Sequence, residues 1–166
     1  MEDLMVKILK DSFMGKSAHY NSLAALKGLS AKEARRKPSK EARSVWENLY
    51  HIVFWHNIIL EVAQGAEVDW KALEGRDWPD ADKMNIDSEW EVLCRAFALA
   101  IEQAQDLLEN LSLTKPTPGW ADGTVAKAMV VLAQHNSYHL GQIVMARRML
   151  GKWPPPEEPK IGGSED

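Results

Sequence analysis

The sequence predicts an all-α protein built as a four-helix bundle, and three observations lead to this fold class. Apolar residues recur at helical spacing through several long segments, and cap signals stand at the segment ends. No segment shows the alternation of apolar and polar residues that a half-buried strand would need. One long connection in the middle of the chain then sets the order of the helices.

The N-terminal part of the chain is predicted to contain two helical stretches. Leu4, Ile8 and several Met and Phe side chains stand at helical spacing in 2–14, and Gly15 is expected to loosen or break this helix. A second helical stretch is predicted over 17–29. The pattern SAKE that follows is a capping box, in which serine and glutamate satisfy each other's backbone N–H groups before a short basic turn.

A helix over 44–64 and the long connection after it determine the predicted topology. The helix begins with the capping-box pattern SVWE and ends at Gly65. The connection, 65–85, contains Asp, Gly, Pro and two Trp residues. Because connections of this length are uncommon in compact domains, we expect it to cross the length of the bundle. The helices would then run up-down-down-up, with the crossover between helices 2 and 3.

The C-terminal half is predicted to supply the last two helices. The pattern SEWE caps a helix over 88–111, the turn-rich stretch PTPGWADG follows, and a helix over 124–150 ends at Gly151. Residues 1–153 are expected to form a single helical domain. The proline-rich segment 154–166 cannot continue a helix and is expected to be an extended tail, frayed at its end.

The composition excludes several classes of function. A net charge of −4 argues against a general nucleic-acid binder, which would carry a basic excess. Cys94 is the only cysteine, which rules out an intramolecular disulfide and a cysteine-rich zinc site, and we expect it to be a small core thiol. The N-terminus lacks the apolar stretch of a signal peptide, and the aliphatic runs are too short to span a membrane. We therefore expect a soluble cytoplasmic protein that binds neither nucleic acid nor membrane.

The stretch AQHNSYHLGQI in the last predicted helix carries the sharpest functional signal. His135 and His139 lie four residues apart, near the centre of an apolar stripe on the helical wheel. Buried imidazoles need partners for their nitrogens, and a divalent metal ion would satisfy both rings at once. The spacing alone also fits two histidines that fill the core. Gln142 follows on nearly the same side, where it would orient a ligand or make a plain hydrogen bond between helices.

A third metal ligand would come from the helix over 44–64, which offers His51 and His56. These two lie five residues apart, about 140° around a helix, so both are not expected to reach one ion. The helical wheel slightly favours His56. His19 stands alone beside Tyr20, in the manner of a cap or surface residue.

Several of these motifs together resemble the DinB-like family of four-helix bundles, whose superfamily includes bacillithiol and mycothiol transferases. The similar stretches are HNSYHLGQI, SVWENLYHIVFW, a tail that begins GKWPP, and SAHYNSLAALKGLSAKEARRKPSKEARSVWENLYHI. Their order matches the family along nearly the whole chain.

The resemblance implies a divalent metal held by three histidines, one from the second long helix and two from the last. Matched onto this chain, the ligands are His51, His135 and His139. The match thus selects His51 against the weak wheel preference for His56. His19 falls in the triplet Ala-His-Tyr, where some family members have Trp-His-Gly, so it is a candidate for a place behind the metal ligands or in the cavity and not for a ligand.

The function that the resemblance implies is a metal-dependent thiol S-transferase acting on electrophilic small molecules. Three imidazoles leave coordination positions open, and both zinc and nickel suit such ligands. A low-molecular-weight thiol would be the co-substrate. Two alternatives remain: a non-catalytic metal-binding stress or small-molecule-binding protein, and a metal-dependent hydrolase. We also expect a homodimer formed through a helix face.

Overall fold

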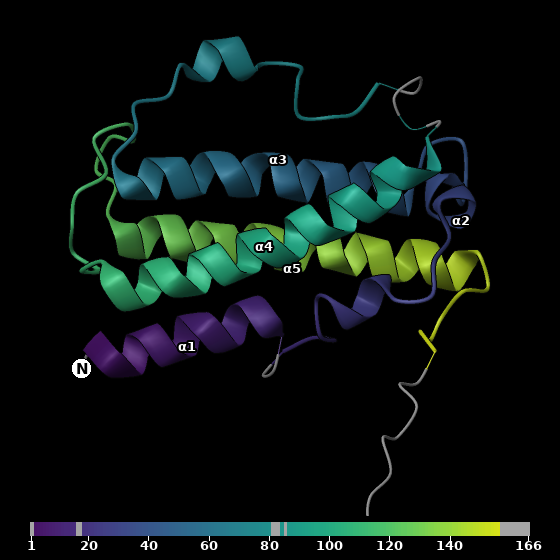
Figure 1. Cartoon of the computed structure of the whole chain (residues 1–166), viewed down its shortest axis with the longest axis horizontal. Helices are drawn as coiled ribbons and strands as arrows, with labels where there is room; N and C mark the ends of the chain where they lie inside the picture. The colour runs from purple at the N-terminus through teal and green to yellow at the C-terminus, as the bar shows by residue number, and fades with distance from the viewer. Residues whose placement is uncertain (1, 16–17, 81–83, 85, 157–166) are drawn as a thin grey trace, which may run out of the picture.

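The chain folds into four long helices joined by shorter helical turns (Figure 1). The structure is a computed structural model that describes residues 2–15, 18–80, 84 and 86–156. The elements in chain order are α1 (Glu2–Met14), η1 (Ala24–Leu26), α2 (Ala31–Arg35), α3 (Val45–Gln64), η2 (Trp70–Leu73), α4 (Asp87–Asn110) and α5 (Val125–Met149). No strand occurs among the described residues, which confirms the predicted all-α class.

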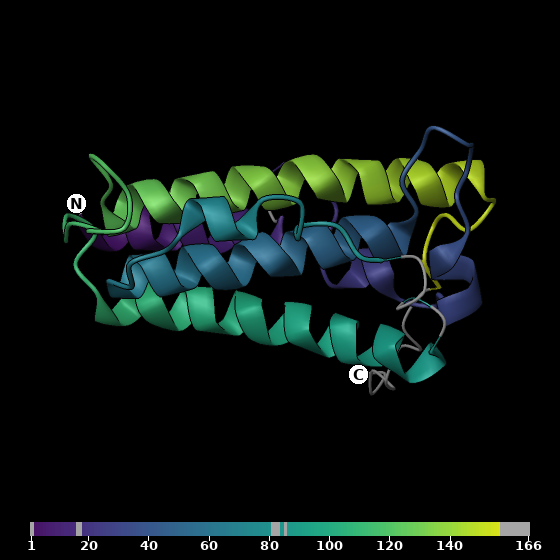
Figure 2. The same cartoon turned by 90° about the horizontal axis from the view of Figure 1, so that it is seen from above.

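The four long helices pack side by side, and α3 lies against both α4 and α5. Figure 1 shows α3 and α4 running in one direction and α1 and α5 running in the opposite direction. The described part of the connection between α3 and α4 runs along the outside of α3 and includes η2 (Figures 1 and 2). This connection therefore covers a helix that carries one of the candidate metal ligands.

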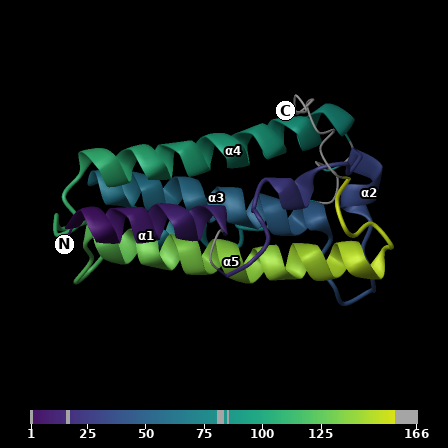
Figure 3. The same cartoon turned by 90° about the horizontal axis from the view of Figure 1, so that it is seen from below.

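The helix predicted over 17–29 is wrong for the described part of that stretch, where only η1 is helical. Two polar side chains explain the difference. The Asn21 side-chain oxygen accepts the N–H of Ala24 at 2.9 Å, and the Ser22 hydroxyl donates to the carbonyl of Phe13 at 2.9 Å. Such side chains satisfy backbone groups locally and compete with a continuous helix. As a result α1 covers only part of its face of the bundle, and the stretch with η1 covers the rest (Figure 3).

Helix α3 begins and ends where the sequence predicts. The Ser44 hydroxyl accepts the N–H of Glu47 at 3.1 Å, and the Glu47 carboxylate accepts the N–H of Ser44 at 2.8 Å, so the predicted capping box is confirmed. Gly65 ends the helix with a φ of 111°, a conformation that other residues rarely adopt. The Ser44 carbonyl also accepts a hydrogen bond from the Asn48 side chain at 2.9 Å, one turn into the helix.

Helix α4 starts without the capping box that the pattern SEWE predicts. The helix begins at Asp87, so Ser88 already lies within its first turn, and Ile86 at the cap position offers no capping side chain. Arg35 holds this end instead, donating to the Asp87 carboxylate at 2.9 Å and to the Met84 carbonyl at 2.6 Å. A contact from a distant helix thus sets the start, and no local pattern could have shown it.

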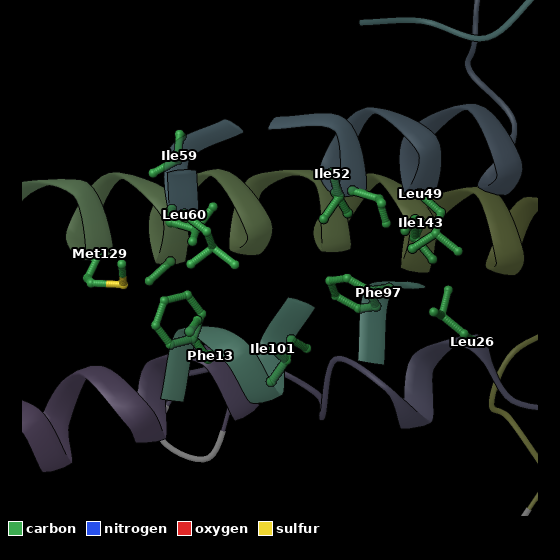
Figure 4. Close-up of a cluster of buried hydrophobic side chains, with 14 of the residues drawn as sticks. Phe13, Leu26, Leu49, Ile52, Ile59, Leu60, Phe97, Ile101, Met129 and Ile143 are labelled. Atoms are coloured by element: carbon green, nitrogen blue, oxygen red, sulfur yellow. The ribbon is translucent and has the colours of Figure 1, made fainter. Parts of the chain in front are cut away.

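The apolar core lies between the four long helices and η1 (Figure 4). Figure 4 shows Phe13 of α1, Phe97 of α4 and Ile52 of α3 directed into the space between the helices. Cys94 is partly buried, and burial raises its pKa to about 11, so this thiol stays protonated at neutral pH. None of the helices in the described part of the chain is both long and apolar enough to cross a membrane.

The beginning of the predicted tail 154–166 packs back onto the bundle. Pro155 is buried, and Pro156 lies so close to Gly28 that a Cβ there would stand 2.5 Å from the proline ring. Gly28 also has a φ of 72°. Its lack of a side chain therefore permits both the turn and the contact. The remainder of the predicted tail, 157–166, lies outside the described residues.

Replacing Ser44 by Ala should lower the free energy of unfolding by about 1–2 kcal/mol. The change removes the hydroxyl half of the capping box of α3 and leaves the N–H of Glu47 unpaired in a buried position. Urea unfolding followed by circular dichroism measures the effect. Ser30→Ala is the matched control, because Ser30 forms the same capping box on the short helix α2 but is exposed. The expected loss there is smaller, and equal losses would contradict the role given to the buried cap.

Candidate metal centre

Three histidines from two helices meet on the side of the bundle where α3 packs against α5. His135 and His139 lie one turn apart on α5, with ring centroids 4.6 Å apart. His51 of α3 places its ring 4.5 Å from His139 and 5.1 Å from His135. Each ring offers one nitrogen such that the three nitrogens lie within 4.8 Å of one another. The cluster could therefore hold a metal ion.

Hydrogen bonds fix the orientation of two of the three rings. The Nδ1–H of His139 donates to the Asn48 side-chain oxygen at 3.1 Å, since the amide nitrogen of Asn48 is used on the Ser44 carbonyl. The Nδ1–H of His51 donates to the Asp77 carbonyl at 2.9 Å, because a carbonyl can only accept. Both rings therefore carry their proton on Nδ1, and their Nε2 lone pairs remain available to a ligand.

The crossover covers the outer face of His51. The indole of Trp78 stacks on this imidazole with centroids 4.1 Å apart and an angle of 18° between the planes. On the same indole, the Arg43 guanidinium lies 4.2 Å from the ring centroid. The Asp77 carboxylate stands 3.4 Å from the His51 Nδ1. These contacts hold His51 between the helix and the crossover, and they exclude water from one side of the cluster.

The surroundings keep the three histidines neutral. Burial, with the nearby rings of His139 and His51, lowers the pKa of His135 to about 4. Burial and His51 lower the pKa of His139 to about 4, although a hydrogen bond with Gln142 acts in the opposite direction. Burial also lowers the pKa of His51, against the effect of Asp77. At neutral pH all three rings therefore offer unprotonated nitrogens, as metal binding requires.

His135 supplies a test of whether a metal suits this site. Its Nδ1 is buried and has no hydrogen-bond partner among the described residues, which is costly for a polar atom. The rings of His51 and His139 are already oriented by their own partners. Three neutral nitrogens, one of them on a ring whose Nδ1 has no hydrogen-bond partner among the described residues, form a donor set that suits a divalent ion such as zinc or nickel.

The other candidate residues lie in different positions. Gln142 stands close to His139 and acts against the lowering of the pKa of that ring, as its place on the helix suggests. His19 lies outside the cluster, with its Nδ1 2.9 Å from the Tyr20 carbonyl and its Nε2 2.9 Å from the Ser137 hydroxyl. It lines a separate cavity between α1 and α5.

His56 is fully buried in the core rather than in the cluster. Its ring lies near Phe13 and Phe97, with centroids 6.0 and 6.4 Å away, and its Nδ1 is 3.3 Å from the Asn136 side chain. The structure thus brings His51 to the α5 pair and leaves His56 among aromatic rings, against the preference of the helical wheel. The helical wheel does not distinguish the ligand from the core residue, because both histidines fall inside one broad apolar arc.

Sequence reasoning missed three residues around the cluster. Asn48 precedes His51 by three positions and faces the same helix, and a buried amide in an apolar helix is a signal that could have identified it. Asp77 and Trp78 come from the crossover, where no spacing relates them to a helix. Their contacts follow from the path of the connection and could not have been predicted from local sequence.

Comparison with known families gives one match. A family model described as the DinB superfamily matches residues 16–143, which include all three histidines of the cluster. Neither a curated protein nor a solved structure gives a significant match to the chain.

The metal-free protein should lose stability as the pH is lowered from about 6.5 toward 4. Burial lowers the pKa of His56 from 6.5 to about 4, so the unfolded chain takes up a proton in this window and the folded chain does not. Between pH 7.5 and pH 5 this difference lowers the free energy of unfolding by about 2 kcal/mol. Urea unfolding in the presence of a chelator at both pH values measures it.

The variant His56→Gln isolates this contribution, because it removes the titrating ring. Its loss of stability between the two pH values should be smaller than that of the wild type by about 2 kcal/mol. Asn57→Gln, an exposed change at the next position of α3, should keep the wild-type dependence. An unchanged dependence in His56→Gln would contradict the assignment.

Proposed function

The chain belongs to the DinB superfamily, and from that premise we propose that it is a metal-dependent thiol S-transferase acting on small electrophilic molecules. The observation that carries the proposal is the convergence of His51, His135 and His139, whose pKa values are all lowered. Three protein ligands leave coordination positions open, as catalytic metal sites do and closed structural sites do not. A divalent ion held there would lower the pKa of a coordinated thiol and supply a nucleophilic thiolate at neutral pH.

The protein side chains then have defined tasks. Asn48 keeps the proton of His139 on Nδ1, and Asp77 does the same for His51, so that the Nε2 of each of these two rings is presented to the ion. Trp78 shields His51 from water, which strengthens electrostatic interactions inside the site. Cys94, with its raised pKa and its position on α4, is not required as a nucleophile, because the thiol comes from a low-molecular-weight co-substrate. Such thiols are kept reduced in the cytoplasm, where we propose that the protein acts.

One observation disfavours the metal-dependent hydrolase, which leaves a non-catalytic metal-binding protein as the second candidate. The side-chain carboxylate that stands next to the cluster is that of Asp77, and it faces the Nδ1 of His51 rather than its metal-binding nitrogen. The described residues around the cluster thus offer no separate general base. This arrangement disfavours the hydrolase alternative, whereas a thiol that loses its proton on coordination needs no such base.

We also propose that two copies of the chain pair through the outer face of α5. This face carries exposed apolar side chains, Tyr138, Met145 and Met149, at helical spacing. Gly141 lies among them, and a Cβ there would meet no described atom within 4 Å. A glycine in such a stripe permits the backbones of two helices to approach closely.

Removing one histidine should remove the metal. The untagged wild type is expected to contain about one zinc or nickel ion per chain, and His51→Ala to contain almost none by elemental analysis. Asn48→Ala, which removes only the partner of His139, should weaken metal binding roughly 10- to 100-fold. His19→Ala is the matched control, because His19 lies outside the cluster, and it should retain the metal. Full metal retention by His51→Ala would overturn the ligand assignment.

Turnover separates the two candidate functions. With a panel of low-molecular-weight thiols and electrophiles that includes a chlorinated aromatic, the wild type should form thioethers in a reaction that a chelator stops and added zinc or nickel restores. The His51→Ala variant should be at least about 100-fold slower, because it lacks a metal ligand. If the panel gives no turnover while metal raises the melting temperature, the protein is a non-catalytic metal binder.

Light scattering tests the pairing through α5. The wild type should give particles of about twice the 18.7 kDa chain mass, and Tyr138→Glu should give single chains, because it places a charge in the apolar face. Val92→Glu, an equally drastic change on the exposed side of α4, is the control and should remain paired. Wild-type particles of single-chain mass would exclude the dimer.

A further inference from the structure

An apolar cavity of about 460 Å³ lies beside the three-histidine cluster, and His135 belongs to both. The other lining residues are Trp55, Ile59, Trp70, Trp120 and Val131. A cavity of this size accommodates a small organic molecule. His51 and His139 are buried and only His135 is partly exposed, so the cavity lies against the accessible ring of the cluster.

The walls of the cavity come from four parts of the chain that are tied together. Helices α3 and α5 supply one side, the crossover supplies Trp70, and the connection before α5 supplies Trp120. The Trp70 indole N–H donates to the Gly119 carbonyl at 3.0 Å, and the two indoles lie 6.4 Å apart. A Cβ on Gly119 would stand 2.5 Å from the Ala66 carbonyl oxygen, so a glycine is needed for the two connections to approach this closely.

The apolar lining of the cavity disfavours ligands that carry a charge. Apart from the imidazole of His135, every described side chain that lines the cavity is aliphatic or aromatic. The nearby cation, Lys127, lies over the Trp120 ring at 5.5 Å and is not part of the lining. Arg43 and Asp77 stand near Trp78 and His51 and do not line the cavity. A charged group in the cavity would lose its water without gaining a partner, whereas an apolar group would gain burial against three indoles.

We propose that this cavity binds the uncharged apolar part, preferably an aromatic ring, of the electrophilic substrate; this inference rests on the proposed function and names its substrate class. The bound substrate lies with its reactive carbon toward His135. In the transfer, the thiol sulfur forms a bond to that carbon, the bond from the carbon to the leaving group breaks, and the leaving group departs with the electron pair. The thiol proton passes to solvent.

Binding of an uncharged fluorescent probe, N-phenyl-1-naphthylamine, tests the cavity without any reaction. The wild type should bind it with an increase in probe fluorescence. Val131→Phe should weaken binding at least about tenfold, because Val131 is only partly buried and the added ring would occupy the cavity. Val92→Phe, the same change at an exposed position outside the lining, is the matched control and should bind as the wild type does. Equal binding by Val131→Phe and the wild type would overturn the proposal.

A second variant tests the cavity independently, in case Val131→Phe does not fold. Trp70→Ala removes one wall and its hydrogen bond to Gly119, and it should also weaken probe binding. Methyl 2-naphthoate should displace the probe, and the 2-naphthoate anion should do so at least about tenfold less well, because the lining offers no cation. Equal displacement by the anion would contradict an uncharged substrate class.

A separate measurement, quenching of probe fluorescence by the metal, tests whether the cavity lies beside the cluster. Filling the cluster with Co²⁺ instead of Zn²⁺ should quench the fluorescence of the bound probe, and this difference should vanish in His51→Ala. No difference between the two metals would place the bound molecule away from the cluster. Probe binding that persists in His51→Ala, without metal-dependent transfer in the wild type, would leave the cavity assignment standing and overturn the thiol-transferase function. Transfer at the wild-type rate in Val131→Phe would instead overturn the cavity assignment and leave the thiol-transferase function standing.

Discussion

The register between α3 and α5 is the constraint on which the candidate metal centre depends. One helix supplies His51 and the other supplies His135 and His139, and a slip of one helical turn, about 5.4 Å, exceeds the 4.5 Å between the rings of His51 and His139. The buried chain of hydrogen bonds from Ser44 through Asn48 to His139 opposes such a slip. The start of α3 is thereby linked to the position of a ring on α5, and the capping box contributes to the geometry of the site as well as to helix stability.

The same burial that orients the histidines makes the metal-free cluster a weak point of the fold. Burial lowers the pKa values of His135 and His139 to about 4, and the Nδ1 of His135 has no partner among the described residues. An apolar side chain at these positions would avoid those costs, since a buried polar group is expensive when it is not satisfied. A bound ion would convert the cost into affinity, because it would pair the lone pairs that the fold keeps unprotonated. Residues that lower the stability of the fold in this way are expected at functional sites.

The sequence predicts the helices better than it predicts their connections, and the site better on α5 than on α3. The capping box of α3, the glycine that ends it and the pair on α5 follow from local pattern. The stretch over 17–29 has helical periodicity, but the side chains of Asn21 and Ser22 satisfy backbone groups in a turn instead. On α3 the choice of His51 needed the family resemblance, because an apolar arc does not distinguish it from His56. Asp77 and Trp78 depend on the path of the chain in space, which periodicity does not encode.

The crossover contributes to both the candidate metal centre and the apolar cavity beside it. On one side of the cluster it places Asp77 and Trp78 against His51, and earlier in its path it places Trp70 at the apolar cavity beside His135. One connection thus covers His51 and also forms part of the apolar cavity beside His135. A crossover lying outside α3 does both without interrupting the core, which explains why so long a connection is compatible with a compact fold.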